Sequence, residues 1–288
     1  MKVLSFGEGL WDIYPDSEHL GGAPLNFAAH FKKCGGESSI ITAVGADALG
    51  KKTFDEIEKL GIITKYVTYS EKETGKCLVT LDENLIPTYN LLDHVAYDCI
   101  KVPEFGTDFF DVLYFGTLSL RNENNRAVLK QIISENNFDE IFVDVNIRAP
   151  YYCNDTIRFA LESATIIKIS EEELPTVMGL VSESTPSVKE SALIIGKEFP
   201  KIKMVIITKG DKGSFVYDRI NEKSYECASQ QVKLVSTVGA GDSFSAAFLA
   251  KYLKTKDIEK SLDFSTKISG YVVSCKGAIP DYDVKDFA

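Results

Sequence analysis

The second half of the chain alternates short apolar, β-branched runs with longer segments of helical periodicity, and few folds can accommodate that order. Strands that alternate with helices predict a parallel sheet covered by helices on both faces. The expected strands of this half are 111–115, 141–145, 166–170 and 204–208, and two earlier runs, 3–6 and 38–44, have the same apolar character. We therefore expect an α/β fold around one large, mostly parallel sheet.

Residues 67–97 depart from this pattern, because they contain three short strand-like runs with no helix between them. The runs are 67–69, 76–81 and 87–92, separated by Glu73-Thr74-Gly75 and Asp82-Glu83-Asn84. They predict a small sheet apart from the main body.

Composition limits the function classes. With 288 residues, 44% of them hydrophobic, the chain can bury a large core. A net charge of −10 argues against nucleic acid or an anionic membrane as partner. Six cysteines form no CxxC pair, and no 18 apolar residues run together. We expect a cytoplasmic protein with reduced thiols, neither exported nor membrane-spanning.

The stretch 235–245 predicts an anion site. Small residues from Gly239 to Gly241 precede a run of helical periodicity, and unpaired N–H groups and the helix dipole at a helix start both favour a phosphate. Asp242 would repel that anion unless it takes a proton from a hydroxyl that attacks the phosphate. The alternative is that Asp242 only caps the helix.

Two further groups of residues fit such chemistry. Gly22 and Asn26, in a glycine-rich loop that leads into a helix, suit a hydroxyl-bearing ligand. Basic side chains fall at successive strand ends, where functional loops of parallel sheets gather. They are Arg121, Arg148, Lys168 and Lys209. Any one of them could be a surface ion pair, but together they favour phosphate handling.

Gly239-Ala240-Gly241-Asp242, followed by Ser243-Phe244, resembles the signature of the ribokinase-like (PfkB) family of carbohydrate kinases. Segments 21–29, 116–121 and 144–148 are similar to the fructokinase branch. The resemblance implies a three-layer sandwich with a central, mostly parallel sheet and a small β-sheet lid. The implied core is 1–13, 21–66 and 98–288, and the implied lid is 14–20 and 67–97.

The resemblance also implies roles for individual residues. Asp242 is the implied base, the turn Gly239, Ala240 and Gly241 is the implied anion hole, and Arg121 adds a clamp on the phosphate. The implied sugar contacts are Asp12, Gly22 and Asn26, although Asp12 could be a plain turn residue. The implied ATP contacts are Lys168, Thr208, Lys209, Gly210 and Gly213, and Glu171 is the implied acid that organises Mg²⁺. Lys168 stands where much of the family has asparagine.

The expected activity is ATP-dependent phosphorylation of a neutral sugar at a primary hydroxyl, with fructose as the first choice. The segment 68–97 contains two basic residues, Lys72 and Lys76, and five acidic ones. We therefore expect no cationic cluster there that could hold a phosphorylated sugar. The alternatives are another neutral sugar or a nucleoside, such as ribose, ketodeoxygluconate or inosine, or a sugar-sensing protein without activity. A homodimer through the lid is a further possibility.

One position departs from the family pattern. Ser236 stands where many relatives have an aspartate that helps bind a monovalent cation. A neutral hydroxyl removes the Coulombic part of that binding. We therefore expect weak or absent activation by K⁺.

Overall fold

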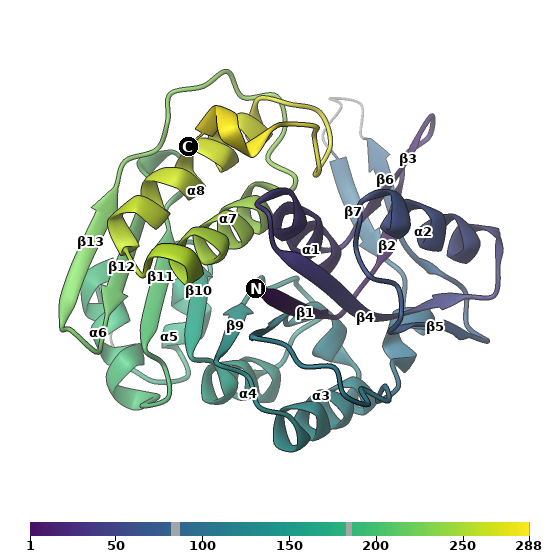
Figure 1. Cartoon of the computed structure of the whole chain (residues 1–288), viewed down its shortest axis with the longest axis horizontal. Helices are drawn as coiled ribbons and strands as arrows, with labels where there is room; N and C mark the ends of the chain where they lie inside the picture. Colours follow the sequence, from purple (N-terminus) through teal and green to yellow (C-terminus); the bar gives the residue numbers. More distant parts are fainter. Residues whose placement is uncertain (82–86, 183–185, 288) are drawn as a thin grey trace.

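The computed structural model describes residues 1–81, 87–182 and 186–287, so the turn predicted at Asp82-Glu83-Asn84 lies outside the described residues. Helices cover both faces of a large twisted sheet, and a smaller sheet lies at one side of the molecule (Figure 1). The order of strands in the large sheet is β13-β12-β11-β10-β9-β8-β1-β4-β5. All pairs are parallel except β11 with β12 and β12 with β13. The predicted α/β fold with a mostly parallel sheet is confirmed.

Apart from 214–218 and 223–227, which the sequence analysis did not predict, the strands of the large sheet coincide with the predicted apolar runs to within one or two residues. They are β1 (Lys2–Phe6), β4 (Glu37–Gly45), β5 (Val67–Ser70), β8 (Val112–Gly116), β9 (Glu140–Asp144), β10 (Ile166–Ser170), β11 (Met204–Thr208), β12 (Ser214–Asp218) and β13 (Lys223–Cys227).

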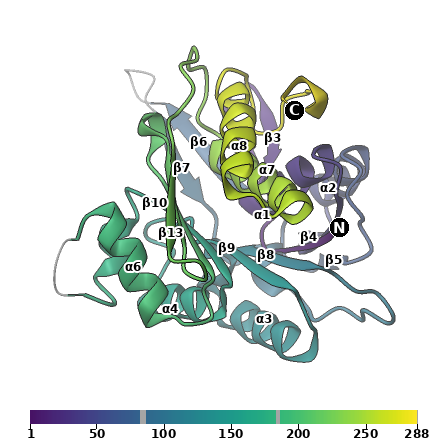
Figure 2. The ribbon, with the colours of Figure 1, turned by 60° about the vertical axis from the view of Figure 1, so that its left-hand side comes forward.

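Two helical layers follow from the alternation of side chains along these strands. In β8, Val112 and Tyr114 pack beneath the helices of one face, while Leu113 and Phe115 pack beneath those of the other. The first face carries α1 (Ala23–Lys33), α2 (Ala48–Lys59), α7 (Ala240–Thr255) and α8 (Ile258–Val273), and the second carries α3 (Glu123–Glu135), α4 (Asn154–Ser163), α5 (Leu174–Met178) and α6 (Val188–Glu198). Figure 2 shows the two layers on opposite sides of the sheet.

The four-stranded sheet has the order β3-β2-β6-β7. Its strands are β2 (Leu10–Ile13), β3 (Glu18–Gly21), β6 (Gly75–Leu81) and β7 (Pro87–Leu91), and β2 runs parallel to β6. Two boundaries differ from the prediction. Residues 10–13 belong to this sheet and 67–70 pair with β4 in the large one, because a strand's own pattern of side chains does not specify which sheet it joins.

The register of β2 separates two neighbouring side chains with different tasks. Trp11 points into the core, is 2% exposed, and donates through Nε1 to Oγ1 of Thr53 at 2.9 Å. The ammonium of Lys52 lies 4.2 Å from the Trp11 ring centre. Asp12, on the opposite side of the pleat, pairs with His19 of β3 and Cys77 of β6. Residues 10–13 thus fix Asp12 on the inner face of the small sheet.

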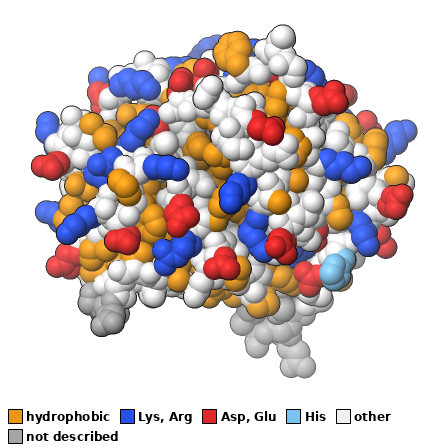
Figure 3. Space-filling view, turned by 90° about the horizontal axis from the view of Figure 1, so that it is seen from below, with side chains coloured by type: hydrophobic (Ala, Val, Ile, Leu, Met, Phe, Trp, Pro, Cys, Tyr) orange, Lys and Arg blue, Asp and Glu red, His pale blue; other side chains and the backbone are white. Residues whose placement is uncertain are grey.

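The surface agrees with the composition. On the face in Figure 3, acidic and basic side chains are interspersed, with no broad field of one sign. No described helix is both long and apolar enough to cross a membrane. All six cysteines are free thiols. Tyr89 and Leu78 of the small sheet are 52% and 37% exposed, and the homodimer through this sheet stays a prediction.

Candidate functional site

The predicted anion turn lies at the first turn of α7. Gly239 has φ +79°, in the left-handed region that favours glycine, and it precedes Ala240, the first residue of the helix. A Cβ on Gly239 would lie 2.4 Å from the carbonyl oxygen of Ala278. No larger residue fits, so the turn is held against the chain that follows α8.

A buried histidine holds Ala278 in place. Nε2 of His30 lies 2.9 Å from the Ala278 carbonyl oxygen and Nδ1 lies 2.8 Å from the hydroxyl of Tyr282. Because the carbonyl can only accept, Nε2 carries the proton and donates. Burial lowers the pKa of His30 to about 4, so the ring is neutral near pH 7. His30 was not singled out from the sequence, where it is one more residue on a buried helix face.

Asn26 and Asp242, which belong to separate sequence motifs, are hydrogen-bonded to each other. Nδ2 of Asn26, in the first turn of α1, donates to Oδ2 of Asp242, in the first turn of α7, at 2.8 Å. Burial raises the pKa of Asp242 to about 6, and the Asn26 hydrogen bond opposes that rise. The carboxyl is therefore mostly ionised at neutral pH and can accept a proton.

Two backbone donors lie beside Asp242. In the first turn of α7, the N–H of Ala240 donates to the carbonyl of Thr237 at 3.2 Å. The N–H groups of Gly241 and Asp242 have no intrahelical acceptor, because they belong to the same first turn. They are the donors best placed for an anion.

A buried ion pair supports this turn from below. Nζ of Lys168 lies 2.7 and 2.9 Å from the two carboxylate oxygens of Asp144, and Oγ of Ser245 donates to Asp144 at 3.2 Å. A Cβ on Gly241 would lie 3.3 Å from Nζ of Lys168. The predicted nucleotide residue Lys168 thus places a fixed positive charge against the anion turn, and its partner Asp144 keeps the pKa of Lys168 raised.

The predicted sugar residues lie around the same point. Oδ1 of Asn26 is buried and has no hydrogen-bond partner among the described residues. Gly22, at φ +108°, leaves room for the carbonyl of Glu8, which a Cβ would approach to 2.4 Å. Burial raises the pKa of Asp12. The charge of His19, a hydrogen bond with the Cys77 thiol and the charge of Arg148 oppose that rise without cancelling it. These groups can accept from and donate to hydroxyls.

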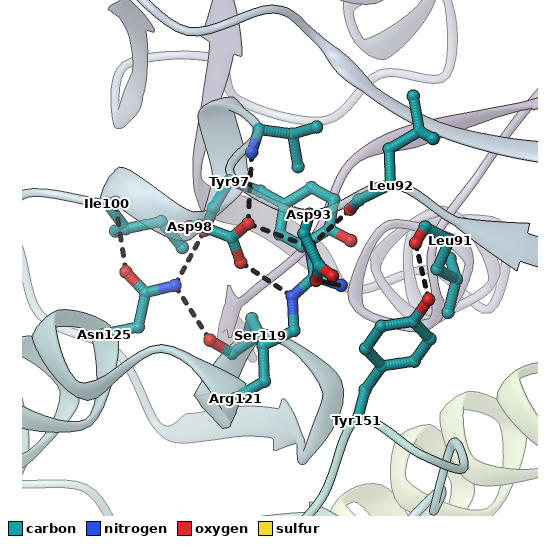
Figure 4. A network of polar contacts seen from close by, with 11 residues as sticks. Leu91, Leu92, Asp93, Tyr97, Asp98, Ile100, Ser119, Arg121, Asn125 and Tyr151 are labelled. Carbon is teal, nitrogen blue, oxygen red and sulfur yellow. Dashed lines mark hydrogen bonds and ion pairs between the residues drawn. The ribbon is translucent and has the colours of Figure 1, made fainter.

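Arg121 has partners that the sequence did not indicate. Its Nε and Nη2 donate to both oxygens of Asp98 at 2.9 and 2.8 Å, and Nη1 lies 3.1 Å from Asp93 (Figure 4). Nη2 also donates to the carbonyl of Leu92 at 2.6 Å, and the guanidinium lies over the rings of Tyr97 and Tyr151. The Arg121 guanidinium is therefore already occupied, at the point where the small sheet returns to the core.

Arg148 presents the opposite case. It lies in the loop after β9, is exposed, and makes no ion pair or side-chain hydrogen bond within the described part of the chain. Its charge nevertheless lowers the pKa values of Asp12, Glu8 and Asp242. The sequence analysis grouped Arg148 with the basic residues at strand ends that favour phosphate handling, but gave it no individual role.

The predicted nucleotide loop follows β11, adjacent to β10. N of Lys209 donates to the carbonyl of Gly213 at 2.7 Å, and a Cβ on Gly213 would lie 2.0 Å from the carbonyl oxygen of Cys227. Thr208 accepts at its carbonyl from N–H of Glu171 at 2.8 Å. Gly210 has φ +57° and is exposed, so this loop offers an open backbone surface.

Glu171 is the predicted magnesium residue. Its carboxylate is partly exposed and 3.1 Å from Nζ of Lys212. The described residues contain no cluster of three side chains that could hold a metal. A single accessible carboxylate fits Mg²⁺ that is bound mainly by phosphates and water.

Three relatives place this geometry among known proteins. An uncharacterised sugar kinase of Pyrococcus horikoshii is 30% identical across 96% of this chain and 88% of its own, and its crystal structure in complex with ATP superposes with a TM-score of 0.83. An ATP-dependent 6-phosphofructokinase of Thermoanaerobacterium thermosaccharolyticum is 28% identical across 97% of this chain and 90% of its own. Fructokinase-2 of Solanum lycopersicum is 26% identical across 96% and 92%.

The family model of pfkB carbohydrate kinases matches residues 16–285, nearly the whole chain. The match includes the Gly239–Asp242 turn, Asn26 and the nucleotide loop. The chain therefore belongs to the pfkB family of carbohydrate kinases and is a sugar kinase.

Proposed function

We propose that this sugar kinase phosphorylates fructose with ATP at a primary hydroxyl. The observation that supports the proposal most directly is the Asn26–Asp242 pair, which holds an ionised carboxylate beside free N–H donors at a helix start. The resemblance of the glycine-rich loop to fructokinases and the fructokinase relative of Solanum lycopersicum favour fructose.

In the proposed reaction, Asp242 accepts the proton of the sugar hydroxyl while the hydroxyl oxygen attacks the γ-phosphorus of ATP. The O–P bond to ADP breaks as the new O–P bond forms, so the phosphoryl group passes to the sugar and ADP leaves. N–H groups of Gly241 and Asp242 donate to the oxygens of the transferring group, and the Lys168 ammonium stabilises their charge through the turn. Asn26 orients Asp242 through Nδ2 and leaves Oδ1 for a substrate hydroxyl.

Mg²⁺ bound to the phosphates near Glu171 would neutralise part of their charge. The nucleotide lies along the loop of Thr208, Lys209, Gly210 and Gly213 in this proposal. A cytoplasmic location, with reduced cysteines and a ready supply of ATP, is part of the same proposal.

The small sheet favours a neutral sugar. Lys76, the lysine in the strands of this sheet, is paired with Glu73 at 3.0 Å and is not free to hold a sugar phosphate. The 6-phosphofructokinase relative makes fructose 6-phosphate the second candidate, because the exposed guanidinium of Arg148 is a possible partner for an additional phosphate.

A substrate panel tests the choice. Purified protein with Mg-ATP is given fructose, fructose 6-phosphate, ribose, ketodeoxygluconate or inosine, and ADP release is followed. We expect the highest kcat/KM with fructose, since hydroxyl-binding groups outnumber free cations in the site. A preference for any other member would replace fructose, and sugar binding without ADP release would indicate a sensing protein.

Asp242→Asn tests the base. The amide can keep the Asn26 contact and the helix start but cannot accept a proton, so turnover should fall by roughly 10²–10⁴ with ATP affinity retained. Steady-state kinetics and circular dichroism check both parts. Near-native kcat in a folded variant would leave Asp242 as a helix cap only.

A pair of arginine variants separates phosphate handling from anchoring. We propose that Arg148, and not Arg121, supplies the mobile cation for the phosphates, so Arg148→Ala should lower kcat/KM for ATP by about tenfold or more without changing Tm. Arg121→Ala should instead lower Tm, because Asp98 is 4% exposed at its side chain and loses its cation. A folded Arg121→Ala variant that loses only ATP use would restore Arg121 as the phosphate clamp.

Potassium dependence follows from Ser236. Oγ of Ser236 accepts from N–H of Val238 at 3.2 Å, and N–H of Ser236 donates at 3.1 Å to the carbonyl of Val273, the last residue of α8. With no carboxylate at position 236, turnover at saturating Mg-ATP and sugar should be equal in potassium chloride and tetramethylammonium chloride of the same ionic strength. A several-fold rise in potassium would mean that carbonyl oxygens suffice to bind the ion.

A further inference from the structure

Glu8 is a second buried acidic side chain that the proposed mechanism does not use. It packs against Gly22, whose carbonyl accepts from N–H of Asn26 at 2.9 Å, and Asn26 is the partner of the candidate base Asp242. Glu8 lies in the turn after β1, is 2% exposed, and packs through its own carbonyl and Cγ against Gly22 of the sugar loop. Its charge interacts with that of Asp242. The side chain therefore lies within the site and is not part of the hydrophobic core.

The carboxyl of Glu8 makes no ion pair with any described residue, and its Oε2 is fully buried without a hydrogen-bond partner among them. Tyr97 and Tyr114 have pKa values that are raised by burial and, to a lesser degree, by a charge on Glu8. Oγ of Ser119 lies 3.0 Å from where a Cβ of Gly7, the residue before Glu8, would be. All three hydroxyls are buried without a partner as well.

Two charged groups affect the ionisation of Glu8. Asp242 on α7 opposes its ionisation, and Arg148 in the loop after β9 favours it. Arg148 is exposed and makes no ion pair with Glu8. A buried carboxylate without a paired cation is costly, and such a group takes up a proton instead.

We propose that Glu8 is an electrostatic partner of Asp242 that works in its protonated form, so that the site carries one ionised carboxyl beside the transferring phosphate. The inference rests on the proposed role of Asp242. The neutral acid keeps a second negative charge away from the γ-phosphate, and its O–H leaves Oε2 able to donate to a neighbouring oxygen. Ionisation of Glu8 would repel ATP and oppose the loss of a proton from the sugar hydroxyl.

The pKa values of the two carboxyls favour a state in which Asp242 is ionised and Glu8 is still protonated. Burial raises the pKa of Glu8 to about 7, above the value of about 6 for Asp242, with the N–H groups of Glu8 and Ala23 opposing the rise. Because the two carboxyls interact, the apparent values belong to the pair. As pH rises, Asp242 ionises first and activity appears, and Glu8 ionises next and activity declines.

The first test is the pH profile of kcat/KM, which reports the free enzyme, with the best sugar of the panel. Wild-type kcat/KM should rise through about pH 6 and fall by about fivefold or more between pH 7 and 9. Glu8→Gln keeps a neutral, hydrogen-bonding side chain, so its kcat/KM at pH 6.5 should stay within about threefold of wild type and the fall at high pH should disappear. Glu140→Gln is the matched control. Glu140 is buried, pairs with Lys203 and begins β9, whereas Asp144 of the site ends that strand. This variant should therefore keep both the rise and the fall of the pH profile.

Two outcomes would overturn the proposal: a wild-type profile that is flat up to pH 9, or a folded Glu8→Gln variant that is inactive at every pH, which would mean that the ionised form is required. A second measurement needs no turnover. The infrared band of a protonated carboxylic acid should be present in the resting protein at pH 6.5 and reduced at pH 9, and Glu8→Gln should weaken it at pH 6.5 to the part that comes from partly protonated Asp242. If Asp242 is not the base, the rise of kcat/KM through about pH 6 should be absent, while the fall at high pH and the infrared band of Glu8 should persist.

Discussion

One hydrogen bond, from Asn26 to Asp242, joins residues 216 positions apart and brings the first turns of α1 and α7 together. It can form only because both helices lie on the same face of the sheet, where aromatic side chains fill the space between them. Phe27 of α1 stacks on Tyr114 of β8 at 3.6 Å between ring centres, and Phe248 of α7 joins the same core cluster. The hydrophobic packing of the core thus sets the position of the carboxylate.

Glycines at backbone contacts provide the second constraint. Gly22, Gly213 and Gly239 each have positive φ and each lie where a Cβ would come within 2.0–2.4 Å of a carbonyl oxygen from another segment. At all three positions the main chain itself packs against main chain, in the sugar loop, the nucleotide loop and the anion turn. The site is therefore built largely from backbone, and side chains such as Lys168 and His30 hold that backbone in place.

Sequence reasoning recovered the fold and the helix start at Gly239–Asp242, since both depend on local patterns. It did not predict the contact between Asn26 and Asp242, which joins distant segments. Alternating apolar runs define the sheet, and the glycine turn with Asp242 identifies a helix start that can bind an anion. The membership of residues 67–70 in the large sheet was missed, because pairing is decided by tertiary contacts. The same limit applies to Arg121, whose partners Asp93 and Asp98 are distant in the sequence and carry no motif, and to Glu8 and His30, whose importance lies in burial.

The register of β2 has a consequence for how the gene can vary in length. Trp11 anchors the small sheet to Thr53, and its neighbour Asp12, the proposed sugar contact, lies on the opposite face of the strand. Inserting or deleting one residue within this strand would exchange the two faces, placing a carboxylate in the core and an indole on the other face. Homologues with extra residues near this sheet must therefore carry them at its turns, and alignments that place a gap inside 10–13 would misassign the acid proposed to contact the sugar.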